Sequence, residues 1–187
     1  MRTWVVILAA CLLVGCADDE PQRPATSPAV GRGVTVELPA GWQRAAESLT
    51  PDLSDPLEVL SVGTFPLRYR TVGCSHMPSS AMEDIGPRDA FITLMERGRD
   101  ERSEWPEFPQ RPGRFGPSLG AGSEGIECVP GKPFRDHWFG FTDAGRHFHT
   151  LVVFGPDAPP EVQDAAWRVL DSLVVDPDAR PTWRSSG

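Results

Sequence analysis

Three histidines near the C-terminal end could act together, because of where they fall in two predicted strands. His147 and His149 are two residues apart, so they share one face of a strand, and His137 lies on the strand before it. Imidazole nitrogens are common zinc ligands, and a bound zinc ion can activate water. The pattern therefore allows a metal-assisted hydrolase. The alternative is polar residues on a half-exposed sheet face, which we adopt, expecting no metal and no other cofactor.

The N-terminal sixteen residues combine three features of an export signal. Arg2 supplies a positive charge, residues 4–14 are apolar, and a small residue precedes Cys16. A membrane span takes about 20 apolar residues, so this run is too short to cross. Its end, Leu13-Val-Gly-Cys16, resembles the lipobox of bacterial lipoproteins, whose cysteine receives a diacylglyceryl group before a signal peptidase cuts in front of it. The alternative is an ordinary signal peptide that happens to end in cysteine.

The resemblance to the lipobox implies where in the cell the protein is located. Residues 1–15 would be removed as the signal peptide, and Cys16 would carry the lipid. Two acyl chains suffice for stable anchoring. We therefore expect the protein on the extracytoplasmic face of the cell membrane, with the membrane itself as one partner.

Two further cysteines, Cys74 and Cys128, lie beyond the signal. An exported protein meets oxidising conditions, so the simplest expectation is one disulfide between them. Closing the loop of 55 residues between them would stabilise the fold by roughly 4 kcal/mol. In the alternative, both thiolates bind a metal with His76, but no second Cys or His lies near Cys128 to complete the usual spacing.

Familiar catalytic motifs are missing from the sequence. Residues 121–125 approximate a nucleophile elbow around Ser123, but no apolar strand precedes them. The chain has no P-loop, no dinucleotide-binding glycine fingerprint and no HExxH motif. We therefore assign no catalytic residue and favour a protein that is not an enzyme.

The charge balance excludes one class of partner. Among 187 residues, 26 Asp and Glu outnumber 18 Lys and Arg, for a formal net charge of −8. An acidic protein is repelled by phosphate backbones, so we expect no nucleic acid partner. The length beyond the signal suits one domain with a single core.

Several segments have the pattern of regular elements. Residues 34–38 alternate apolar with polar, 57–65 are mostly apolar, and 90–95 are predicted to form a central strand. Residues 134–142 and 146–154 flank a Gly-containing turn and predict a hairpin, whose loop holds two or three residues. Helices are predicted over 78–85 and about 159–173. The apolar stripe of the second consists of Val162, Ala165, Ala166, Val169, Leu170 and Leu173.

Other segments carry weaker patterns. Residues 16–33 are predicted to be a disordered tether and 178–187 a loose tail, while 67–78 are ambiguous. Residues 98–123 form a long loop that contains Trp105, Phe108 and Phe115. It is either a mobile flap that offers aromatic anchors to a partner or a surface loop whose aromatic rings pack over the sheet. We favour the second.

Successive strands with single helices between and after them predict one α+β domain over residues 34–177, with a mainly antiparallel sheet. Three features resemble uncharacterised lipoproteins of high-GC Gram-positive bacteria. They are Pro39-Ala-Gly-Trp42, the 138–154 hairpin that turns at Gly145-Arg146, and the closing helix that ends in Leu170-Asp-Ser-Leu173. More distantly, the order of elements resembles the PsbP-like sandwich, in which helices flank an antiparallel sheet. The resemblance implies fold and location, and no functional residues.

Together these features predict a membrane-anchored lipoprotein of the cell envelope with a non-catalytic binding or accessory domain. The expected partner is an envelope protein or a small hydrophobic ligand, bound through the 98–123 loop and the sheet face near Trp138. The alternative is the metal-assisted hydrolase that uses His137, His147 and His149.

Overall fold

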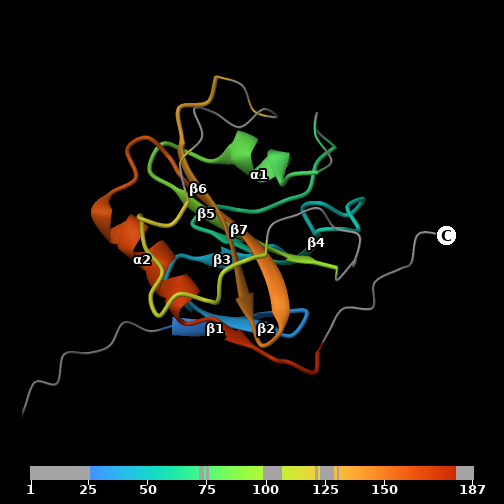
Figure 1. Cartoon of the computed structure of the whole chain (residues 1–187). Helices are drawn as coiled ribbons and strands as arrows, with labels where there is room; N and C mark the ends of the chain where they lie inside the picture. Colours follow the sequence, from blue (N-terminus) through green and yellow to red (C-terminus); the bar gives the residue numbers. More distant parts are fainter. Residues whose placement is uncertain are drawn as a thin grey trace, which may run out of the picture.

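The computed structural model describes residues 26–71, 74, 76–98, 107–120, 122, 129 and 131–179. They fold into two sheets and two helices (Figure 1). The strand order is β1-β2-β8 in the smaller sheet and β3-β4-β5-β7-β6 in the larger, and every pair of neighbouring strands is antiparallel. The predicted α+β class with a mainly antiparallel sheet is confirmed.

The elements have the following bounds. The smaller sheet contains β1 (Thr26–Gly31), β2 (Val34–Pro39) and β8 (Val174–Val175). The larger contains β3 (Gln43–Arg44), β4 (Leu57–Gly63), β5 (Ala90–Arg97), β6 (Arg135–Asp143) and β7 (Arg146–Phe154). The helices are α1 (Ser79–Asp84) and α2 (Pro160–Asp171).

Strand β1 corrects one prediction, because it lies inside the segment predicted to be a tether. It pairs along its whole length with β2, from Thr26 opposite Pro39 to Gly31 opposite Val34. Strand pairing uses backbone N–H and C=O groups, so it succeeds although only Ala29 and Gly31 of this strand are buried. Pro28 is tolerated because β1 is an edge strand. The tether prediction is therefore wrong for residues 26–31.

Both hairpins of the structure close through two-residue turns. In the β6–β7 hairpin Asp143 pairs with Arg146, and the loop residues Ala144 and Gly145 have φ of 49° and 69°. In the β1–β2 hairpin the loop is Arg32-Gly33, also with positive φ at both residues. These are type I′ turns, whose twist matches that of the flanking strands. The structure thus decides the loop length that the sequence pattern left open.

The larger sheet is covered on both faces, and β7 shows how. Its side chains Phe148, Val152 and Phe154 belong to a core cluster with α2 and the smaller sheet. The alternate residues Leu151 and Val153 belong to a second cluster with α1. In Figure 1 the helices lie apart, α1 at the top and α2 at the left. We refer to the two sides of the larger sheet as its α2 face and its α1 face.

The described part of the long loop covers the outer edge of β6. The N–H of Arg111 donates to the Thr142 carbonyl (2.8 Å), and the N–H of Thr142 donates to the Pro109 carbonyl (2.7 Å). Phe115 is buried, with its ring 5.3 Å from that of Phe141. Packing over the sheet is confirmed for Phe108 and Phe115, whereas Trp105 lies outside the described residues. Such a cover protects an edge strand from pairing with other chains.

Candidate functional site

The three histidines do not come together, which corrects their predicted geometry. In the β6–β7 register His137 pairs with Val152, whereas His147 pairs with Thr142 and His149 with Gly140. Paired residues share a face and faces alternate along a strand, so His137 lies on the α2 face and the other two on the α1 face. The His137 ring packs against that of Trp167 at 5.1 Å.

The turn length is the physical reason for this separation. A loop longer by one residue would pair His137 with Leu151 and place all three imidazoles on one face, because a one-residue shift reverses the face of every side chain. Among the described residues, no three His, Cys, Asp or Glu side chains are placed to hold one metal ion. The arrangement assumed for the metal-assisted hydrolase is therefore wrong.

The predicted sheet face near Trp138 does exist, and we call it the Trp138 face. It lies on the α1 face at the β6 end of the larger sheet. Its indole is 37% exposed, and it is the one aromatic among the exposed large apolar side chains of the described chain. The rings of Trp138 and His149 lie 5.8 Å apart. The Trp138 face consists of Trp138, Phe108, His147, His149 and Arg97.

Gly140 shapes the Trp138 face because it has no side chain. A Cβ atom at Gly140 would lie 2.7 Å from the ring of Phe108, so glycine leaves the space that Phe108 fills. From there the Phe108 ring meets that of His149 edge to face at 4.6 Å. The rings beside Trp138 are therefore held by packing before any partner binds. A partner that covers Trp138 loses less free energy to ordering these side chains.

His149 is neutral at ordinary pH. Its side chain is buried, and burial lowers its pKa to about 4, with a smaller contribution from the positive charge of Arg97. The other imidazole of the face, His147, has its Nδ1 3.2 Å from the Thr142 hydroxyl. A neutral ring among aromatic neighbours suits contact with apolar groups better than acid–base chemistry.

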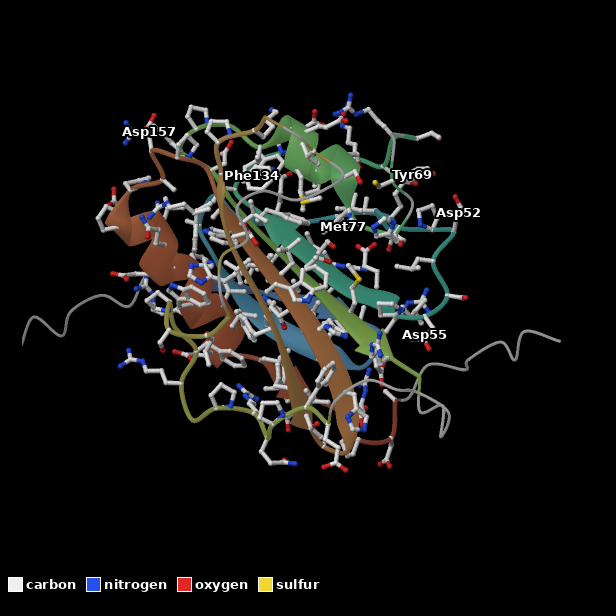
Figure 2. The ribbon with its side chains drawn as sticks, turned by 45° about the horizontal axis from the view of Figure 1, so that its top comes forward. Asp52, Asp55, Tyr69, Met77, Phe134 and Asp157 are labelled. Carbon is white, nitrogen blue, oxygen red and sulfur yellow. The ribbon has the colours of Figure 1, made fainter. Side chains whose placement is uncertain are left out.

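A second candidate site lies at the N-terminal end of α1, and we call it the Tyr69 hollow. It holds about 60 Å³ between residues 49–52 on one side and residues 69–71, 74, 77, 79 and 80 on the other. Figure 2 shows Asp52, Tyr69 and Met77 on the same side of the molecule, beside α1. The hollow is lined by Leu49, Thr50, Pro51, Asp52, Tyr69, Arg70, Thr71, Cys74, Met77, Ser79 and Ser80.

One wall of the Tyr69 hollow is held by Glu58, a buried carboxylate in β4. Its Oε2 accepts hydrogen bonds from the Leu49 N–H (2.7 Å), from the N–H and hydroxyl of Thr50 (2.9 and 3.0 Å) and from the Ser48 hydroxyl (2.8 Å). Its Oε1 accepts from the Ser61 hydroxyl (2.5 Å). Four of these five donors belong to residues 48–50, so the carboxylate holds this segment against β4.

The sequence reasoning missed this hollow because its walls are distant in the chain and one of them, 67–78, had no clear pattern. A signal was nevertheless present. Glu58 is the one charged residue in the apolar strand Leu57–Gly63, and a buried carboxylate requires donors close by. The Ser- and Thr-containing segment 48–50 supplies them.

The predicted covalent sites are only partly described. Cys74 is disulfide-bonded and lies in the wall of the Tyr69 hollow. Cys128, Cys16 and Ser123 lie outside the described residues, so the pairing of Cys74 with Cys128 and the lipidation of Cys16 stay predictions.

Comparison with protein-family models and with curated proteins found no match for this chain. The resemblances to lipoproteins of high-GC bacteria and to the PsbP-like sandwich therefore stay predictions. In the part of the chain that the structure describes, neither helix has the length and apolar character needed to span a membrane.

Proposed function

We propose that this protein is a lipoprotein of the cell envelope, anchored through Cys16 on the extracytoplasmic side of the membrane, and that its domain is a non-catalytic binding module. The anchor is supported by the charged start, the apolar run and the lipobox-like Leu13-Val-Gly-Cys16. The disulfide-bonded state of Cys74 agrees with an oxidising compartment.

The observation that supports the binding role is the exposed indole of Trp138, which lies beside closely packed aromatic rings. Tryptophan is enriched among the residues that dominate interface energies, because its large ring gains much from losing water. The neutral His149 ring lies beside it and packs in turn on Phe108, so the surface next to the indole is aromatic. A protein surface or a small hydrophobic ligand that covers Trp138 matches this chemistry.

The lipid anchor is tested by a substitution at Cys16. Cys16→Ser removes the sulfur that would carry the lipid, and we expect the protein to move from the membrane fraction to the soluble fraction. Cys11→Ser, inside the apolar run, is the matched control and should leave it in the membrane. Retention of the Cys16→Ser protein would contradict the anchor.

The binding role is tested in the full-length protein in its own envelope. A photo-crosslinking phenylalanine analogue at Trp138 should yield one defined crosslinked partner or lipid-like adduct, identified by mass spectrometry. The same analogue at Val174, which is 64% exposed on β8, is the control and should not yield that product. Equal crosslinking at both positions, or none at Trp138, would reject the Trp138 face as the binding surface.

A further inference from the structure

We propose that an open recess beside Phe134 binds a small apolar carboxylate, such as a short-chain fatty acid, and that Lys132 recognises its charge. We call this recess the Phe134 niche. It is separate from the Trp138 face and does not depend on the proposed function. Two observations carry the proposal: the walls are apolar and held in place, and they include one cation without a counter-charge. The niche is lined by Ile85, Pro87, Lys132, Pro133, Phe134 and Pro156.

Three separate segments of the chain form the Phe134 niche. Ile85 directly follows α1, Phe134 precedes β6, and Pro156 follows β7. Figure 2 shows Phe134 and Asp157, the neighbour of Pro156, on the same upper side of the molecule. Ile85 is buried and Phe134 half-buried, and both pack with the core cluster of the α1 face. The three lining prolines are exposed, and their rings have little freedom to lose when a ligand binds.

Backbone contacts fix two of these segments against each other. The N–H of Gly155 donates to the Asp89 carbonyl (2.9 Å), and the N–H of Asp157 donates to the Pro87 carbonyl (2.8 Å). A Cβ atom at residue 155 would collide with the Gly86 carbonyl oxygen, so only glycine allows this close approach. These contacts need no ligand, so this part of the niche has its shape before anything binds.

Lys132 is the one charged residue among the described residues that line the niche. Its Nζ donates to the Glu83 carbonyl at 2.6 Å, which holds the ammonium near the C-terminal end of α1. No carboxylate in the described part of the chain lies within ion-pair distance of it. An ammonium has three N–H donors, so two remain for a ligand. A carboxylate would supply both the counter-charge and acceptor oxygens for these donors.

The size and polarity of the niche select the other end of the ligand. The niche holds about 180 Å³. A cavity of about 150 Å³ accommodates benzene, so a ring or a chain of about six carbons fits here. Apart from Lys132, the lining side chains are hydrocarbon. A cationic ligand would meet a like charge, and an anion without a carbon chain would bury no apolar surface against Phe134 and the prolines.

The sequence provides two specific NMR reporters for the test. The chain has one lysine, so labelled lysine gives a single signal set, from Lys132. Labelled isoleucine methyls report on Ile85 in the wall, with the buried Ile92 of β5 as an internal control. The full-length protein is titrated with hexanoate. Acetate lacks the carbon chain, hexanol lacks the charge, and hexylammonium carries the opposite charge, so these three are the comparison probes.

We expect hexanoate to shift the Lys132 and Ile85 signals in a saturable way, while Ile92 stays in place. Each methylene removed from the acid should weaken binding about threefold, so acetate should bind far more weakly. Lys132→Gln keeps a donor for the Glu83 carbonyl but loses the charge, and it should bind hexanoate about three- to fivefold more weakly, measured at Ile85. Lys132→Arg keeps the charge and should bind more tightly than Lys132→Gln.

Arg88→Gln is the matched control for the loss of a positive charge. Arg88 is an exposed cation next to Pro87, but it does not line the niche. The Arg88→Gln protein should therefore bind hexanoate as the unmodified protein does.

Three outcomes would overturn the proposal. They are no saturable shift at Ile85 and Lys132 with hexanoate, binding of hexanol or hexylammonium as tight as that of hexanoate, and equal hexanoate binding by the Lys132→Gln and unmodified proteins. If Lys132→Gln does not fold, judged by the Ile92 signal, the comparison of the four probes on the unmodified protein still decides. Loss of crosslinking at Trp138 would leave this result untouched.

Discussion

Arg146 and Glu96 form a buried ion pair at the junction of the two sheets. The Nε of Arg146 donates to Glu96 Oε1 at 2.9 Å and its Nη2 to Oε2 at 2.7 Å, and the two side chains are 1% and 5% exposed. The remaining N–H groups donate to the carbonyl oxygens of Arg32 (3.0 Å), Gly33 (3.1 Å) and Asp176 (3.2 Å). All five donors of one guanidinium are thus used, and the residue after the second hairpin turn holds the first turn in place.

Replacing Arg146 by Met is expected to lower the free energy of unfolding by about 3–5 kcal/mol, because it leaves the Glu96 carboxylate buried without its counter-charge. Arg146→Lys should also destabilise, since an ammonium cannot reproduce the five-donor fork. Urea unfolding measures both. Arg135→Met, at an exposed position of β6, is the control, and a loss below about 1 kcal/mol at Arg146 would contradict this view of the pair.

Glu58→Gln is expected to cost about 2–4 kcal/mol of unfolding free energy. The amide of Gln has one uncharged acceptor oxygen, whereas both oxygens of the Glu58 carboxylate accept hydrogen bonds, from five donors in all. The buried N–H groups of Leu49 and Thr50 therefore lose a charged acceptor. Urea unfolding measures the loss, with the exposed Glu37→Gln for comparison. The same change should broaden the Tyr69 NMR signal, because the wall of the Tyr69 hollow loosens. A stability equal to that of Glu37→Gln would show that the network does not hold the wall.

Acidification should destabilise the fold through His149. Its pKa is about 4 in the folded protein, against an ordinary value of 6.5, because burial and then Arg97 disfavour the imidazolium ion. Between these values the unfolded chain binds the proton and the folded chain does not, so stability falls as pH drops from about 6.5 to about 4 and this contribution then levels off.

The expected loss at His149 is about 2 kcal/mol, less than the full shift implies because solvent screens part of it. Urea unfolding at pH 7 and at pH 4.5 measures it. His149→Phe removes the titrating group, so its stability should change less between the two pH values. The exposed His76→Gln should behave as the unmodified protein. Equal pH dependence in the His149→Phe protein would assign the effect to other groups.

Ala144→Asn is expected to stabilise the protein by about 0.5–1 kcal/mol. Ala144 has a φ of 49°, a left-handed conformation that Asn tolerates better than Ala, and Asn-Gly is the preferred pair for a type I′ turn. The thermal midpoint should rise by a few degrees. Ala46→Asn, at an exposed position outside the positive-φ set, should not raise it. A lower midpoint for Ala144→Asn would contradict the turn assignment.

Much of the fold could be predicted because its signals are local. Alternation and apolar runs located β2, β4 and β5, and the Gly-containing turn located the β6–β7 hairpin. Both helices were predicted within two residues of their observed bounds. The two-residue strands β3 and β8 and the mostly exposed β1 escaped prediction, because they are defined by backbone pairing with other strands.

The candidate sites depend on tertiary structure much more strongly. The sequence by itself determined the spacing of the histidines, the chemistry expected of Cys16, and a Trp138 that belongs to a strand. Only the folded chain decided that a two-residue turn sends His137 to the face opposite His149. The folded chain also decided that Glu58 holds the 48–50 segment by hydrogen bonds and that Arg146 meets carbonyl groups more than a hundred residues away. Local pattern follows from side-chain periodicity, whereas register parity and buried polar partners depend on how distant segments meet.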